Sequence, residues 1–120
     1  MEKERDLKKR TKRFCIDCIH LLEEIPNTFL GYHIKGQLIR SSSSVAANYR
    51  AANLAQSTAS FVSKISIVIE EADESQFWLE LIADFNLIKS EERNKLEQEA
   101  SELAAIFVSS RKKLQNRKFN

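Results

Sequence analysis

The stretch that decides the fold of this chain is RSSSSVAANY, residues 40–49. Four serines in a row are typical of a flexible linker. Here, however, Leu38 and Val45 lie seven residues apart, so the apolar spacing of a helix continues through the run. The run also contains neither Gly nor Pro, the residues that interrupt helices. We therefore predict a helix whose small side chains let neighbouring backbones approach closely.

Apolar spacing on both sides of this run predicts an all-α fold with four long helices. Their starts and stops are recognisable: the first covers about residues 4–25 before Pro26, and the others follow the N-caps Thr28, Ser57 and Ser90. Short connections between long helices favour an antiparallel, up-down-up-down four-helix bundle. We expect a single domain over 1–120, with the basic tails at about 1–6 and 115–120 as candidates for disorder.

The apolar spacing within each helix also predicts which residues face the core. These are Leu7, Phe14, Cys18, Leu22 and Ile25; Leu30, Ile34, Leu38, Ser41, Val45 and Ala52; Phe61, Ile65, Val68, Ala72, Leu79 and Ile82; and Leu96, Ala100, Leu103, Phe107 and Leu114. In the second helix, Gly31 and Gly36 weaken the first half, so a later start is also considered.

The second and third helices carry more apolar surface than one core needs. The extra residues are Tyr32, Ile39, Ala46 and Tyr49 on one helix, and Ile67, Trp78, Leu81 and Phe85 on the other. We interpret them as contacts between subunits of a homo-oligomer, and a wide core stripe is the alternative. The candidate packing positions are Ser42, Ala46, Asn48, Tyr49 and Trp78.

The net charge of +2 hides a strong segregation. Residues 1–13 hold seven basic and three acidic residues, and residues 111–118 hold five basic residues and no acid. An up-down-up-down bundle brings both segments to one end and collects acids at the other, at Glu23, Glu24, Glu80, Asp84, Glu91 and Glu92. A concentrated basic end is the electrostatic footprint of nucleic-acid binding, although such runs also serve solubility.

The residues that we expect to contact phosphate are the cations of this basic end and of the second helix. They are Lys8, Lys9, Arg10, Lys12, Arg13, Arg40, Arg50, Arg111, Lys112, Lys113, Arg117 and Lys118. No helix-turn-helix or finger motif is present, so sequence-specific readout is not expected.

The sequence offers no catalytic motif, so we expect no enzyme activity, no cofactor and no metal. Cys15 and Cys18 lie on the apolar side of the first helix without a histidine spaced to complete a zinc site, and we interpret them as small buried residues. The acids of residues 70–74 are interpreted as a solvated face or as partners of Lys and Arg on a neighbour.

The chain also lacks the features of a membrane or secreted protein. No apolar run approaches the roughly 20 residues that a membrane span needs. The first ten residues, MEKERDLKKR, lack the apolar core of a signal peptide. We therefore expect a cytoplasmic protein without membrane contact.

Three segments together resemble a known family: QLIRSSSSVAANYR at 37–50, SxxSFVxK at 57–64 and EEADESxxWL at 70–79. They are similar to the four-helix-bundle proteins of the 23S rRNA intervening-sequence family, which includes the accessory variability protein of diversity-generating retroelements. The resemblance covers about residues 7–110. It implies an up-and-down bundle, a ring-like homopentamer, no known enzyme activity and, for the retroelement branch, a basic partner of a reverse transcriptase.

The matching positions are Arg40, Asn48, Tyr49 and Arg50 on the second helix, with Glu71, Glu74 and Trp78 on the third. The chain departs from the family pattern where Ala51 and Ala52 stand in place of an acid, and where Ser60 precedes Phe61. These departures leave the second helix without any acid.

We therefore predict a non-enzymatic, oligomeric bundle that binds RNA or DNA electrostatically through its basic end, as an accessory to rRNA or to a reverse transcriptase. The alternative is a protein-interaction adaptor for which nucleic acid is incidental. A further alternative is a helical ribonuclease using Arg13 and His20, which share one helix face, although any helix can carry such a pair by chance. The sequence does not distinguish RNA from DNA, or one family branch from the other.

Overall fold

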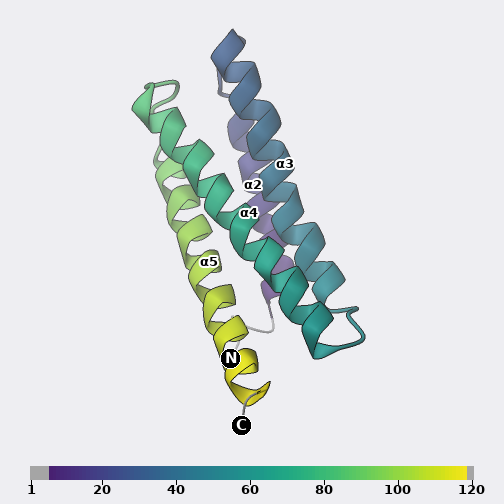
Figure 1. The fold of residues 1–120 in the computed structure, drawn as a ribbon. Helices are drawn as coiled ribbons and strands as arrows, with labels where there is room; N and C mark the ends of the chain where they lie inside the picture. Colours follow the sequence, from purple (N-terminus) through teal and green to yellow (C-terminus); the bar gives the residue numbers. More distant parts are fainter. Residues whose placement is uncertain (1–5, 119–120) are drawn as a thin grey trace.

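The computed structural model describes residues 6–118, and these residues form four α-helices without any strand. The helices are α2 (Leu7–Leu22), α3 (Phe29–Ala52), α4 (Thr58–Asp84) and α5 (Glu91–Lys118). Figure 1 shows them running alternately up and down, with the start of α2, the end of α5 and the α3–α4 turn at the lower end. Each helix packs against its neighbours in chain order, and α5 packs back on α2. The predicted all-α, antiparallel bundle is therefore confirmed.

Three of the predicted helix starts are held by side-chain hydrogen bonds. The hydroxyl of Thr28 accepts from the Gly31 amide at 3.0 Å, and the hydroxyl of Ser57 accepts from the Ser60 amide at 3.0 Å. The hydroxyl of Ser90 accepts from the amide of Glu92 at 3.1 Å. Each bond satisfies an amide that the first helical turn leaves without a partner.

The first helix ends earlier than predicted. The α-helical bonding stops at Leu22, and the amides of Glu23, Glu24 and Ile25 each donate to the carbonyl three residues before, at 3.0–3.2 Å. The chain thus stays wound up to Pro26, but in a tighter turn than an α-helix. At the other terminus, α5 continues to Lys118, so the described part of that basic tail is helical.

Gly31 permits the close connection between α2 and α3. A Cβ atom placed on Gly31 would lie 2.0 Å from the carbonyl oxygen of Pro26, whereas one placed on Gly36 would meet nothing within 4 Å. Helix α3 consequently begins directly after Thr28. The alternative prediction, that this helix starts later, is wrong. The weak helix former Gly31 is required here because only it leaves room for the Pro26 carbonyl.

The predicted stripes form one buried core. Nearly all of their members are closed to solvent, and Leu30, Phe61 and Leu114 are half-buried. Within the serine run, Ser41 and Ser42 are fully buried, while Ser43 is exposed and donates to the Ile39 carbonyl at 2.7 Å. The run therefore lies inside a helix, as its spacing predicted, and its buried members Ser41 and Ser42 pack within the same chain.

Candidate nucleic-acid interface

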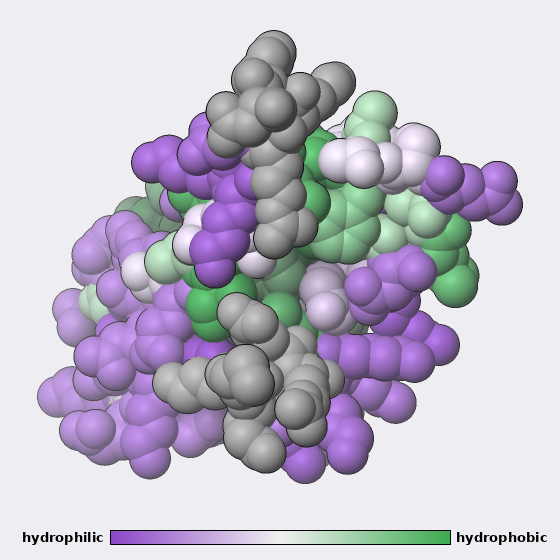
Figure 2. Space-filling view, turned by 90° about the horizontal axis from the view of Figure 1, so that it is seen from below, coloured by the Kyte–Doolittle hydropathy of each residue, from purple (hydrophilic) through white to green (hydrophobic). Residues whose placement is uncertain are grey.

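One end of the bundle carries a dense set of cations. It is formed by the start of α2, the end of α3, the start of α4 and the end of α5 (Figure 1). Residues 7–14, 43–69 and 103–118 contain no Asp or Glu. Asp6 directly precedes the first of these segments. Their basic residues are Lys8, Lys9, Arg10, Lys12, Arg13, Arg50, Lys64, Arg111, Lys112, Lys113, Arg117 and Lys118. Figure 2 looks onto this basic end and shows hydrophilic residues over much of it.

A groove between α2 and α3 brings two of the predicted phosphate contacts together. It has a volume of about 370 Å³ and is lined by Lys12, Ser43, Ala46, Ala47 and Arg50. Lys12 comes from α2 and Arg50 from the last turn of α3, and both side chains are exposed. The three residues between them are small, so a ligand can approach the α3 backbone closely.

Most of the other predicted cations are also exposed. Lys8, Lys9, Lys112 and Lys113 make no ion pair with any residue in the described range 6–118. Arg13 has only a long contact of 3.9 Å with Asp17, and its side chain is 71% exposed. The half-buried Arg111 donates to the hydroxyl of Ser66 at 3.1 Å. The side chains of Arg117 and Lys118 lie outside the described residues.

Arg10 differs from these cations because its charge is used inside the bundle. Its Nε and Nη2 atoms donate to the two carboxylate oxygens of Glu99 at 2.7 Å each, and Nη2 also donates to Glu102 at 3.1 Å. The hydrogen bond with Glu99 raises the pKa of the Arg10 guanidinium. The structure thus places Arg10 in a bridge between α2 and α5, and not among the free cations.

Arg40 is likewise engaged, at a point midway along α3. Its guanidinium donates to Glu71 at 2.7 Å and also to Glu74, both on α4. The indole of Trp78 donates to Glu74 at 3.0 Å, and its ring lies edge-on to His33 with centroids 5.5 Å apart. The bond from Trp78 and the charge of Arg40 lower the pKa of Glu74. Glu71 and Glu74, two of the acids predicted as a solvated face or as partners of a neighbouring cation, therefore bind Arg40, and the contact of Arg40 with phosphate remains a prediction.

The candidate packing residues are mostly occupied within their own chain. Ser42 is buried, Asn48 donates to the carbonyl of Ser44 at 3.0 Å, and the ring of Tyr49 lies 5.3 Å from that of Phe107. Trp78 belongs to the Arg40 network described above. Ala46 differs, because it lines the groove beside Lys12. Their role between subunits remains a prediction.

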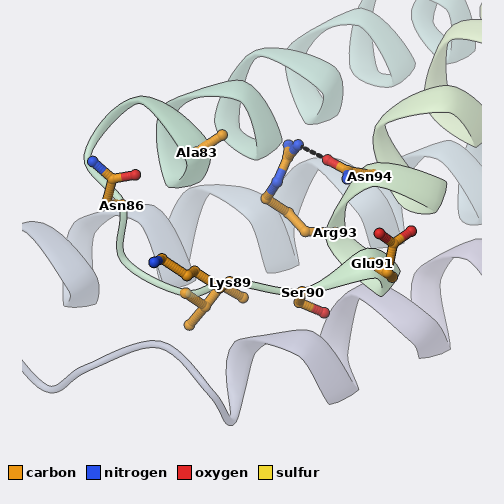
Figure 3. Close-up of a pocket in the computed structure, with 8 residues that line it drawn as sticks. Ala83, Asn86, Lys89, Ser90, Glu91, Arg93 and Asn94 are labelled. Atoms are coloured by element: carbon orange, nitrogen blue, oxygen red, sulfur yellow. Dashed lines mark hydrogen bonds between the residues drawn. The ribbon is translucent and has the colours of Figure 1, made fainter.

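A second concave surface lies at the opposite end, at the α4–α5 turn (Figure 3). Its volume is about 440 Å³, and Asn86 gives the turn its positive φ of 50°. The buried Arg93 donates to the Leu79 carbonyl at 2.9 Å, to Glu97 at 2.6 Å and to Asn94. Arg93 was not predicted from the sequence as a buried residue. The only signal of its burial is its place one turn before Leu96 on the inner stripe of α5. Its hydrogen bonds serve the turn, so the pocket lacks a free cation from this residue.

The residues considered for catalysis or metal binding form no site in the structure. Arg13 and His20 are both exposed on α2, and Arg13 points its guanidinium toward Asp17. Within residues 6–118, no three His, Cys, Asp or Glu side chains gather to hold a metal ion. The thiols of Cys15 and Cys18 are free, and burial raises the pKa of both.

Comparison with known proteins agrees with the four-helix fold and with the three family-like segments of the sequence. The family description "23S rRNA-intervening sequence protein" matches residues 3–109, which include all three resembling segments. The chain belongs to this family. A comparison with curated proteins finds no match.

A solved structure of a similar protein has the same fold. It is a crystal structure of a protein of unknown function from the S23 ribosomal protein family of Bacteroides thetaiotaomicron. The two chains superpose with a TM-score of 0.81 and 29% identity, over 88% of this chain and 98% of the other. Neither description names an enzyme activity. In the described part of this family member, no helix is long and apolar enough to cross a membrane.

Proposed function

We propose that this protein is a non-enzymatic RNA-binding bundle whose basic end contacts the phosphate backbone, in a role connected with ribosomal RNA. The observation that carries the proposal is the groove in which Lys12 and Arg50 flank the small residues Ser43, Ala46 and Ala47. The family description supports ribosomal RNA over the template of a reverse transcriptase as the target. Arg13 and His20 stand two helical turns apart on α2, and the guanidinium of Arg13 lies 3.9 Å from Asp17, so binding without cleavage fits the site.

The charge layout supports phosphate as the ligand. The groove lies in the part of the bundle where residues 43–69 and 103–118 contribute no carboxylate, so no acid in those segments competes with RNA for the cations. Each phosphate neutralised by Lys or Arg releases counterions, which makes such binding steeply dependent on salt. Lys8, Lys9, Lys112 and Lys113 add further exposed charge at the same end of the bundle, where they would extend the contact beyond one phosphate.

The test is the affinity of the protein for labelled RNA across a salt series. A Lys12→Gln, Arg50→Gln double variant should weaken binding about tenfold at low salt and reduce the salt slope by about two. The matched control is Lys89→Gln with Lys95→Gln, which removes the same charge from exposed positions at the other end. If both double variants weaken binding equally, or if the wild type binds independently of salt, the proposal fails.

We also propose that the chain forms a homo-oligomer, which would multiply the basic end. Support comes from the side chains of Tyr32 and Ile39, which are 61% and 43% exposed on α3. Tyr32 and Ile39 are seven residues apart and so share one face of α3, which makes this face a candidate for subunit contact. Sedimentation of the wild type should give a mass above 13.8 kDa. A purely monomeric protein at working concentrations contradicts this part of the proposal alone.

A further inference from the structure

The outward side of α4 carries a regular row of acids around one aromatic residue. The row consists of Glu70, Asp73, Phe77, Glu80 and Asp84, whose spacings of three and four residues place them on one face of the helix. All five side chains are exposed, and the four acids make no ion pair with another residue of the described range. We call this row the acidic face of α4; the helix itself crosses the front of the bundle in Figure 1.

Aromatic side chains are exposed on this face and next to its end. Phe77 is 49% exposed, and its ring lies edge-on to Trp78 with centroids 5.0 Å apart. Trp78 is itself fixed by its hydrogen bond to Glu74. Phe85, one residue past the end of α4, is 57% exposed. Aromatic surface is thus presented to solvent beside negative charge that has no ion-pair partner within residues 6–118.

Neither the fold nor the proposed RNA contact uses this surface. The core contacts of α4 lie on its other side, at Ile65, Val68, Ala72, Leu79 and Ile82. Arg40 of α3 is already bound to Glu71 and Glu74 of α4. RNA would be repelled by four carboxylates, so the ligand of this face must be positively charged and must offer apolar atoms to Phe77 and Phe85.

We propose that the acidic face of α4 binds a cationic, amphipathic segment of a partner protein. Lys and Arg of the segment would pair with Asp73, Glu80 and their neighbours, while its apolar residues pack on Phe77 and Phe85. An Arg placed over Phe77 would add a cation–π contact. The row from Glu70 to Asp84 measures about 20 Å along the helix, which matches a partner helix of about 14 residues.

A second copy of this chain is the other possible occupant. Its cations are concentrated at the basic end, and a copy docked through that end would cover the groove of Lys12 and Arg50. The proposed function assigns that groove to RNA, so the acidic face is assigned to a different protein. This inference goes beyond the proposed function, and it can fail while RNA binding stands.

The test uses the full-length protein and a labelled synthetic helix of about 14 residues, with Leu on one face and Lys or Arg on the other. Phe77→Ser should weaken binding of this peptide about tenfold, and Asp73→Asn with Glu80→Gln should weaken it similarly. The matched control is Glu23→Gln with Glu91→Gln, two exposed acids on other segments, which should change affinity by no more than about twofold. RNA affinity should stay unchanged in every variant.

Three results would overturn the inference. Equal weakening by the control acids would mean that only net charge matters. Unchanged peptide affinity in both test variants would mean that the peptide binds elsewhere. A lower sedimentation mass for Phe77→Ser or for the double variant would assign the face to contact between copies. Because Asp73 and Glu80 are exposed and lie outside the core, their double variant keeps the test valid if Phe77→Ser unfolds.

Discussion

The hydroxyl oxygens of Ser41 on α3 and Ser75 on α4 lie 2.9 Å apart in a part of the core closed to solvent. Each hydroxyl is also close to a carbonyl of its own helix, at 3.4 Å from Leu38 and 2.9 Å from Glu71. The pair is therefore satisfied without water. Because two serines face each other where larger residues would otherwise stand, α3 and α4 can approach closely at this point.

Replacing Ser75 tests that close packing. Ser75→Ala should lower the free energy of unfolding by about 1 kcal/mol, because Ser41 loses its partner across the interface. Ser75→Leu should lower it by about 1–3 kcal/mol, because the added atoms have no space. Urea unfolding measures both, with the exposed Ser43→Ala as the control. An unchanged unfolding midpoint for Ser75→Leu would contradict the close approach.

The two glycines of α3 should respond to alanine with opposite signs. Gly31→Ala should destabilise the protein by about 1–3 kcal/mol, because the new Cβ meets the Pro26 carbonyl. Gly36→Ala meets no neighbouring atom and should stabilise the protein by about 0.5–1 kcal/mol through better helix propensity. Thermal unfolding of both variants gives the comparison. Equal shifts would mean that Gly31 has no special steric role.

The Arg40 network should make stability depend on pH on the acid side. The hydrogen bond from Trp78 and the charge of Arg40 lower the pKa of Glu74 in the folded protein. The contribution of ionised Glu74 to the free energy of unfolding is therefore complete above the ordinary glutamate pKa of 4.5. It is lost as the pH falls through the lower pKa of the folded protein. Glu74→Gln should remove the loss of stability at low pH that comes from protonation of Glu74. This loss amounts to about 1 kcal/mol or less for a partly exposed pair.

Urea unfolding at pH 7 and at successively lower pH, for the wild type and Glu74→Gln, measures the difference between the two slopes. The exposed Glu80→Gln serves as the control. Parallel pH curves for the wild type and Glu74→Gln would show that the network adds nothing to stability.

The two thiols should differ in reactivity. Burial raises the pKa of Cys18, which is closed to solvent, and raises that of the half-buried Cys15 as well. Because the thiolate is the reactive form, a thiol reagent should modify Cys15 slowly and Cys18 only after unfolding. A Cys15→Ser variant isolates Cys18 for the measurement. Rapid labelling of native Cys18 would be inconsistent with its place in the core.

Ala46 tests the groove directly. Ala46→Phe should fill the space between Lys12 and Arg50 and weaken RNA binding about tenfold, with little change in stability because the groove is open. The control is Ala105→Phe, at an exposed position of α5 outside the groove. Comparable RNA affinity for the wild type and Ala46→Phe would exclude the groove as the contact.

Local sequence signals predicted the helices well. The caps Thr28 and Ser57 are visible because a hydroxyl before an apolar stripe has a specific partner two or three residues on. The end of α2 was predicted three residues too late, because the spacing does not distinguish an α-helix from the tighter turn that follows Leu22. Ser75 was overlooked as a buried residue, although its place between Ala72 and Leu79 marks the inner stripe.

The partners of the charged residues could not be predicted in the same way. Arg10 and Arg40 look like free cations in the sequence, yet both bind acids of another helix. Such pairs depend on which helices are neighbours and on their register, neither of which a local pattern specifies. The meeting of Lys12 and Arg50 in one groove has the same origin, since it requires the packing of α2 on α3.

The bridge from Arg10 to Glu99 joins residues 89 positions apart, and this separation matters during synthesis on the ribosome. The α2 segment is made long before α5, so its inner stripe and its guanidinium lack their final partners until the last helix emerges. A nascent chain that ends before Glu99 is an unclosed bundle with Arg10 uncovered. Synthesis of α5 is therefore the step that closes the bundle and gives Arg10 its carboxylate partners.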